Sequence, residues 1–479
     1  MTTPTTVHIV SLGCARNDVD SEELAGRLEA GGFTLVDEPT EAEAVVVNTC
    51  GFIESAKKDS IDTLLAASDL KGHGPTQRVV AVGCMAERYG RELADALPEA
   101  DAVLGFDDYA DIDAKLRLIM AGGHLEAHTP SDRRRLLPLA PAQRQAAASG
   151  VVIPGLQTAD LPQGVAPASG PRVVRKRRGN APSAPIKIAS GCDRRCAFCA
   201  IPSFRGSFVS RPAADIVEEV TWLADHGVRE AFLVSENTSS YGKDLGELGA
   251  LETLLERLNG IDNLDWIRVS YLQPAEIRPG LIEAICSIDK VVPYFDLSFQ
   301  HAAPSVLRRM RRFGDPDSFL ALLERIRTLK PQAGVRSNVI VGFPGETDAD
   351  VRTLVDFVSE ARLDALGVFS YSDEEGTEGA TLGDHVPQEV IDQRYAEVSD
   401  LATDLVDQRA LERVGERVRV LVESHDGNVA VGRAEHQGPE VDGTTSFASG
   451  AHLRVGDLVW GRVTSTDGVD LIAREDGAA

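Results

Sequence analysis

Residues 191–199 read Gly-Cys-Asp-Arg-Arg-Cys-Ala-Phe-Cys, and this stretch decides the fold. Cys192, Cys196 and Cys199 follow an apolar run at 186–189 that is typical of a buried strand. Thiolates ligate iron–sulfur clusters, and a loop of this length can offer three sulfurs to three irons of one cubane. The fourth iron could then bind S-adenosylmethionine (SAM) and cleave it to a radical. A zinc site with a fourth ligand from elsewhere is the alternative for this spacing alone.

The residues that follow the cysteine loop repeat a strand and helix pattern. Apolar runs typical of buried parallel strands alternate with amphipathic helices, such as those expected over 213–226 and 316–329. Six repeats are two short of an eight-fold barrel, in which the chemistry lies at the carboxyl ends of the strands. We therefore predict a six-fold (β/α) partial barrel over 186–385. Its strands are expected near 186–189, 231–234, 266–270, 294–299, 335–341 and 365–371.

Polar residues at the ends of these strands are candidates for binding SAM. Glu236 and Asn237 follow the second strand and are predicted near the methionine end of SAM. Gln300 follows the fourth strand and is predicted near the ribose. Each has an equally good alternative, such as capping a helix or bonding a loop. Phe198 would shield the cluster or lie against the adenine, and core packing is its alternative.

The first part of the chain has an alternating pattern of its own. Helical patterns run from about Asp18 to Gly31-Gly32 and over 53–70. Between them lie short apolar runs with the β-branched content of buried parallel strands. This alternation predicts a doubly wound α/β domain over 5–120. The apolar runs lie at 7–12, 44–47, 79–82 and 102–104.

Three further cysteines come directly after strands of this N-terminal sheet. Cys14, Cys50 and Cys84 each follow one of the apolar runs. Because the carboxyl ends of parallel strands lie on one edge of a sheet, the three thiols should converge there. We predict that they hold a second cluster, although a single cysteine is often just a buried apolar residue. Cys286 lies in a helical pattern and is expected to pack in the core.

Two regions flank the partial barrel. Residues 121–185 lack a sustained period and are predicted to be a partly disordered linker. Their basic run at 175–178 is expected to be a solvated charge cluster, with contact to nucleic acid as the alternative. After a connecting helix at 386–412, short alternating strands predict a small antiparallel β-barrel over 413–479. Such a module presents a binding face, or it serves only stability or oligomerisation.

The composition limits the location and the partners. The chain of 479 residues is 43% hydrophobic and 26% charged, which is typical of globular protein. The start lacks the features of a signal peptide, and no run of about 18 apolar residues exists to cross a membrane. We expect a cytoplasmic protein without membrane contact, whose seven cysteines stay reduced. The formal net charge of −25 favours a basic partner over direct binding of nucleic acid.

These motifs resemble those of the methylthiotransferases, which are radical SAM enzymes. The family combines an N-terminal cluster domain, a radical SAM partial barrel and a small C-terminal barrel, the TRAM module. The resemblance covers nearly the whole chain except the irregular 121–185. Segments 196–206 and 294–301, with Leu307-Arg308-Arg309-Met310, resemble the group that modifies a ribosomal protein aspartate. The tRNA-modifying group usually has Gln-Ser-Gly-Ser where this chain has Gln-His-Ala-Ala at 300–303, and Glu236-Asn237 replaces an expected Gln-Asp.

The resemblance implies an activity and its cofactors. The enzyme would add a methylthio group to the β-carbon of an aspartate in small-subunit ribosomal protein twelve, free or in the ribosome. It would use two [4Fe-4S] clusters and SAM, with an electron donor such as flavodoxin or ferredoxin. The cluster at Cys192, Cys196 and Cys199 would cleave SAM. The cluster at the N-terminal cysteines would present sulfur, and a second SAM would supply the methyl group.

Two other functions remain open from the sequence. Methylthiolation of a tRNA adenosine would be favoured by a basic face on the C-terminal barrel, but residues 411–479 contain seven Arg against twelve Asp plus Glu. A non-catalytic iron–sulfur or zinc-binding scaffold is an alternative of another class. Iron content would separate a cluster from zinc, and turnover of SAM would separate an enzyme from a scaffold.

Overall fold

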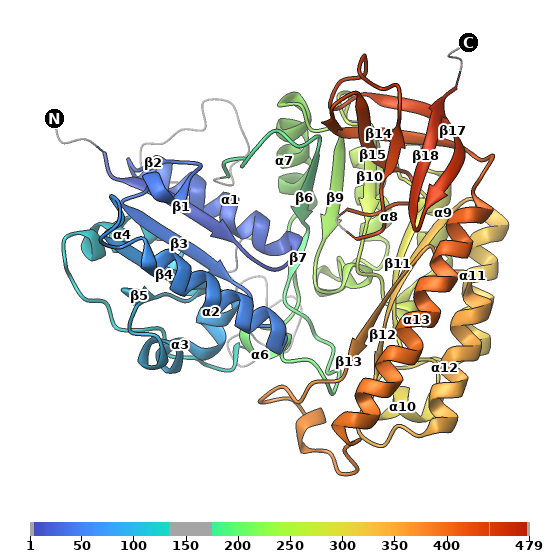
Figure 1. Ribbon diagram of the computed structural model, residues 1–479, viewed down its shortest axis with the longest axis horizontal. Helices are drawn as coiled ribbons and strands as arrows, with labels where there is room; N and C mark the ends of the chain where they lie inside the picture. Colours follow the sequence, from blue (N-terminus) through green and yellow to red (C-terminus); the bar gives the residue numbers. More distant parts are fainter. Residues whose placement is uncertain (1–3, 134–174, 440, 477–479) are drawn as a thin grey trace.

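The chain folds into an N-terminal α/β domain, a central partial barrel and a small C-terminal barrel (Figure 1). The computed structural model describes residues 4–133, 175–439 and 441–476. This architecture confirms the fold class predicted from the sequence. Among the helices in these three ranges, none has the length and apolar character needed to cross a membrane.

The N-terminal domain is built on a parallel sheet in the strand order 2-1-3-4-5. Its strands are β1 (Thr6–Ser11), β2 (Thr34–Leu35), β3 (Ala44–Thr49), β4 (Arg78–Gly83) and β5 (Ala102–Val103). Its helices are α1 (Ala15–Ala30), α2 (Glu54–Asp69), α3 (Cys84–Ala96) and α4 (Ile112–Met120). Apolar residues of α1 and α4 cover one face of the sheet, and those of α2 and α3 cover the other. The strand order therefore reverses between β1 and β3, where sheets of this kind bind ligands at their carboxyl edge.

The start of α1 differs from the expected one. The helix begins at Ala15, directly after Cys14, rather than near Asp18. Cys14 is the N-cap, with an extended backbone and no side-chain hydrogen bond to the first turn. The usual capping signal is therefore missing from the sequence, although the helix begins there.

The central partial barrel has the six predicted strands. They are β6 (Ser183–Lys187), β9 (Glu230–Val234), β10 (Trp266–Val269), β11 (Tyr294–Gln300), β12 (Gly334–Val341) and β13 (Ala365–Ser370). They form two parallel sheets, β10-β9-β6 and β11-β12-β13, which isolated bridges at Ile267–Val291 and Leu272–Leu297 join. The outer helices are α7 (Ala213–Asp225), α8 (Ala250–Asn259), α9 (Pro279–Ser287), α11 (Pro316–Leu329) and α12 (Asp348–Ala361). Their apolar faces and the strands share one core.

A long helix connects the partial barrel to the C-terminal module. This helix, α13 (Gln388–Glu412), packs along β13. The module is a closed barrel of β14 (Arg417–Asp426), β15 (Val429–Ala434), β16 (Thr445–Phe447), β17 (Leu458–Asp467) and β18 (Asp470–Glu475). The sequence pattern did not reveal β16, which is only three residues long. It pairs parallel with β18, so the barrel is not entirely antiparallel.

The C-terminal barrel packs against the amino ends of the partial-barrel strands through buried polar contacts. Glu230, at the start of β9, pairs with Arg268 of β10 and with Arg433 of β15. The hydroxyl of Tyr294, at the start of β11, donates to Asp442 Oδ2 at 2.6 Å. These contacts lie at the amino ends of the strands. The carboxyl ends, where the chemistry of such barrels takes place, lie at the opposite end.

Two arginines at the described edges of the predicted linker are buried against the α/β units. Arg133 is buried and pairs with Glu87. Arg175 has a fully buried side chain and pairs with Glu22 of α1 and Glu219 of α7. The expectation of a solvated charge cluster is therefore wrong for Arg175, because its guanidinium meets one carboxylate from each domain. Most of the stretch expected to be disordered lies outside the described residues.

Arg175 is expected to hold the two α/β units together. Arg175→Ala would leave the carboxylates of Glu22 and Glu219 without this partner, and removing one member of a buried ion pair costs about 3–5 kcal/mol. Urea denaturation should show a loss of that size in the free energy of unfolding. Lys176→Ala is the matched control, since Lys176 pairs with Glu29 on the surface. Equal losses for the two variants would contradict this role.

Candidate functional site

The cysteines of the N-terminal domain converge at the carboxyl edge of its sheet. Cys14 follows β1, Cys50 follows β3, and Cys84 follows β4. Gly13 has a φ of +96°, and a β-carbon there would lie 2.9 Å from Cys50 Sγ. Glycine therefore lets the loop of Cys14 approach Cys50 closely. Burial raises the pKa of Cys84 to about 12, and the charges of Cys14 and Cys50 add to this rise.

The second triad lies in a loop closed by a short hairpin. β7 (Ala189–Ser190) and β8 (Val209–Ser210) pair antiparallel on either side of it. Gly191 has a φ of +78°, and a β-carbon there would lie 2.2 Å from the carbonyl oxygen of Ser207. The loop follows β6, so its cysteines lie at the carboxyl end of the first barrel strand. Burial raises the pKa of Cys199 to about 12 and that of Cys192 well above its ordinary value.

The surroundings of the thiols fit iron–sulfur clusters. Burial penalises free thiolates, and cluster iron would supply the compensating positive charge. N–H bonds to ligand sulfur are among the contacts that tune such clusters. Cys84 Sγ accepts an N–H from Arg205 Nη2 at 3.2 Å, Cys192 Sγ accepts one from the Arg194 backbone at 3.4 Å, and Cys196 Sγ accepts one from Arg312 Nη1 at 3.8 Å.

The triads are not arranged as ligands of a single ion. Within the ranges that the structure describes, no group of three His, Cys, Asp or Glu side chains could hold one metal ion. A cubane is larger than an ion and takes its thiolates on separate irons, so it requires a wider spacing. All seven cysteines are free, and Cys286 packs in the core of the partial barrel as expected.

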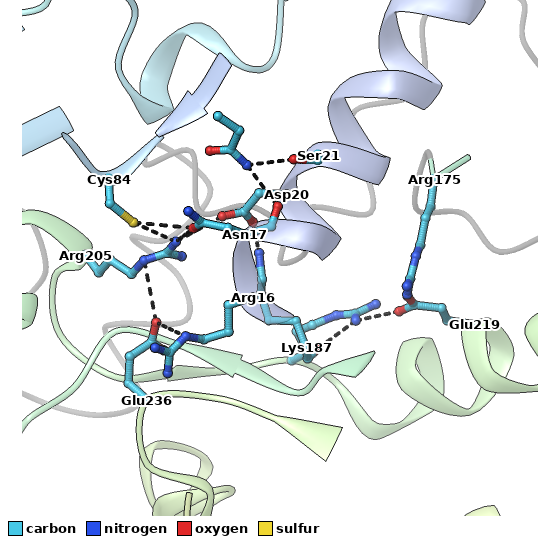
Figure 2. A network of polar contacts seen from close by, with 12 residues as sticks. Arg16, Asn17, Asp20, Ser21, Cys84, Arg175, Lys187, Arg205, Glu219 and Glu236 are labelled. Carbon is cyan, nitrogen blue, oxygen red and sulfur yellow. Dashed lines mark hydrogen bonds and ion pairs between the residues drawn. The ribbon is translucent and has the colours of Figure 1, made fainter. Parts of the chain in front are cut away.

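Buried charged residues adjoin both triads. Figure 2 shows Arg16, Arg205 and Glu236 on the side of Cys84. Arg16 of α1 and Arg205 of α6 (Ile201–Arg205) both face Glu236, with Nε to Oε1 distances of 3.5 and 3.6 Å. Burial alone would lower the pKa of Arg16, but the charges of Cys14 and Glu236 raise it above its ordinary value. In the other triad, Arg16 opposes the rise that burial causes in the pKa of Cys199. The two triads therefore share one electrostatic environment.

Two of the residues predicted to bind SAM have buried acceptor atoms that receive no hydrogen bond from the described residues. The side chain of Glu236 is 1% exposed, and neither carboxylate oxygen accepts a hydrogen bond from the described residues. Asn237 donates from Nδ2 to Ser240 Oγ at 2.9 Å and to Glu276 Oε2 at 3.2 Å. Its Oδ1 has no partner within the same ranges. An Oδ1 without a partner is able to accept a hydrogen bond from a ligand.

The other two candidates lie at the same end of the barrel. Gln300 ends β11 with a φ of +70° and is half-buried. Phe198 is half-buried and packs on an apolar cluster that includes Phe343 and Tyr371. The geometry agrees with the core-packing alternative for Phe198 and leaves its ring partly accessible.

Three arginines of the site were not predicted from the sequence. Arg16, Arg205 and Arg312 contact the cysteines or the carboxylate between them. Arg205 donates a hydrogen bond to Asn17, which lies 188 positions away in the sequence. Local sequence patterns carry no information about contacts at such a separation. The sequence offered one hint, which is that these arginines lie near the cysteines along the chain. Arg16 follows Cys14 closely, and Arg205 lies in the segment that begins with Cys196.

Known families match three successive parts of the chain. Residues 6–105 match the uncharacterized protein family UPF0004, residues 186–358 match the radical SAM superfamily, and residues 414–475 match the TRAM domain. These matches fall on the N-terminal sheet, the partial barrel and the C-terminal barrel.

Similar proteins extend over the full length of the chain. The ribosomal protein uS12 methylthiotransferase RimO of Cutibacterium acnes is 65% identical over 474 residues, covering 99% of this chain and 98% of the relative. The protein of the same name from Streptomyces coelicolor is 64% identical, covering 98% and 96%. Among solved structures, the radical SAM methyltransferase TsrM of Kitasatospora setae, with cobalamin and a [4Fe-4S] cluster bound, has a TM-score of 0.52. It is 16% identical over 77% of this chain and 75% of that chain, so this likeness concerns the fold alone.

Proposed function

The chain belongs to the radical SAM methylthiotransferases, in the group named for ribosomal protein uS12, and we infer from this membership that uS12 is its substrate. The observation that carries the conclusion is 65% identity across 99% of the chain. We propose that the methylthio group is added to the β-carbon of an aspartate. The full-length relatives favour this protein substrate over tRNA and over a non-catalytic scaffold.

The enzyme uses an iron–sulfur cluster and SAM, and we assign the cluster to Cys192, Cys196 and Cys199. When bound, this cluster supplies the electron that cleaves SAM to a radical able to break an unactivated C–H bond. A side-chain base could not remove that hydrogen, because such a proton is too weakly acidic. The protein fixes the loop between β7 and β8 and donates N–H bonds to the sulfurs of Cys192 and Cys196.

We propose a second [4Fe-4S] cluster at Cys14, Cys50 and Cys84, which presents the sulfur for transfer. The convergence of three thiols at the switch point of the sheet supports it. The N–H bond from Arg205 to Cys84 Sγ supports it as well. Because the buried charged residues adjoin both triads, the sulfur donor would lie close to the place where SAM is cleaved.

Residues at the strand ends are proposed to orient SAM. Asn237 Oδ1 is buried without a partner among the described residues, and an ammonium group at the methionine end would satisfy it. Glu236 remains a candidate for the same end, since its Oε2 accepts no hydrogen bond from the described residues. Gln300 is proposed near the ribose, and Phe198 near the adenine or the cluster.

The proposed partners follow from charge and chemistry. The net charge of −25 would speed encounter with a basic ribosomal protein, free or in the ribosome. Electrons would come from a donor such as flavodoxin or ferredoxin. We propose the cytoplasm as the place of this reaction, because uS12 is made there and thiols stay reduced there.

Cells that lack the gene test this function against cells restored with the wild-type copy. We expect the intact mass of uS12 to rise by one methylthio group only when the gene is present. The tRNA nucleosides of the same cells should be unchanged. A methylthioadenosine that depends on the gene, together with unmodified uS12, would contradict the protein substrate.

A further inference from the structure

One arginine that follows the second cysteine triad in the chain contacts the first triad. Arg205 is the last residue of α6, which begins shortly after Cys199 of the second triad. Its Nη2 donates to Cys84 Sγ of the first triad at 3.2 Å. In Figure 2 its side chain reaches from α6 toward Cys84 on one side and Glu236 on the other. A single short helix therefore links a candidate ligand of one cluster to a candidate ligand of the other.

The guanidinium is held rigidly and keeps its charge. Nη2 also donates to Asn17 Oδ1 at 2.9 Å and to Asp20 Oδ2 at 3.0 Å. The group lies 5.0 Å from the centre of the Phe106 ring, and its side chain is 4% exposed. An arginine guanidinium stays protonated in proteins, so Arg205 carries a fixed positive charge beside Cys84.

We propose that Arg205 is a positioning residue that raises the reduction potential of the cluster held by Cys14, Cys50 and Cys84. The proposal rests on the second cluster of the proposed function. Reduction adds negative charge to a cluster, and an N–H bond to a ligand sulfur together with a fixed cation stabilises that charge. The effect is large because the site is buried and the local dielectric is low.

The test is a redox titration of the full-length protein followed by electron paramagnetic resonance. Cys192, Cys196 and Cys199 are replaced with alanine in this background, so only the N-terminal cluster is observed. Arg205→Gln should shift the ratio of reduced to oxidised cluster at a fixed potential about tenfold toward oxidised, as expected for the loss of a charged hydrogen bond. For a one-electron couple, this tenfold change corresponds to a reduction potential about 59 mV lower than that of the same cluster with Arg205 in place. Arg205→Lys, which keeps the charge, should give a smaller shift.

Arg312→Gln is the matched control, because it removes the same charge beside the other triad, 3.8 Å from Cys196 Sγ. It should leave the N-terminal cluster unchanged. An unshifted potential in Arg205→Gln with full iron content would overturn the proposal, as would an equal shift in Arg312→Gln. If Arg205→Gln fails to assemble the cluster, Arg205→Lys must still lower the potential, and an unchanged value is contrary to the proposal. A background protein without iron would instead disprove the second cluster itself.

Discussion

Replacing Cys196 with alanine is expected to abolish the cleavage of SAM. The variant loses one of three thiolates in the loop between β7 and β8, and two thiolates cannot hold a cubane with one open iron in its place. Formation of 5′-deoxyadenosine by the anaerobic, chemically reduced protein should fall below detection. No transfer to uS12 should remain, because the radical is needed first.

Cys286→Ala is the matched control for this loss. Cys286 is the one cysteine outside both triads, and it packs in the core of the partial barrel. Its replacement removes a small buried sulfur and should cost about 1 kcal/mol of stability without affecting SAM cleavage. Cleavage at the wild-type rate in Cys196→Ala would exclude this triad as the site of radical formation.

Replacing Cys50 with alanine is expected to separate the two halves of the reaction. Cys50 lies at the end of β3, in the N-terminal domain, and its loss removes a ligand only from the second proposed cluster. Cleavage of SAM should continue at a rate similar to that of the wild type. The methylthio product on a uS12 substrate should disappear, because no sulfur is presented to the substrate carbon. Both products can be measured by mass spectrometry in one reaction.

Two results would contradict this separation. Unchanged methylthiolation in Cys50→Ala would mean that the N-terminal triad does not hold the sulfur source. If Cys50→Ala lost both SAM cleavage and methylthio transfer, the two triads would not act independently. The shared layer of Arg16, Glu236 and Arg205 makes a modest change in cleavage rate compatible with the proposal.

The sequence was informative wherever a local pattern determines the structure. The expected helix over 316–329 agrees with α11, because Asp315 caps a helix that begins with proline and has a regular apolar face. The barrel strands were found because parallel strands buried on both faces are continuous apolar runs. The placement of six cysteines after strands followed from the same patterns.

The remaining features depend on contacts between distant residues. Arg175 was expected in solvent, but it is buried between Glu22 and Glu219, which belong to different domains. The contact from Arg205 to Cys84 likewise exists only after two domains have packed. β2 and β16 are too short to give a periodic signal, and tertiary pairing alone defines them.

Iron and sulfide content, with Mössbauer spectra, tests the two-cluster site most directly. Three anaerobically prepared proteins suffice: the wild type, a Cys192, Cys196 and Cys199 triple alanine variant, and a Cys14, Cys50 and Cys84 triple alanine variant. We expect about eight irons per chain in the wild type and about four in each variant, all in [4Fe-4S] clusters. About four irons in the wild type, unchanged when the N-terminal triad is removed, would contradict the second cluster.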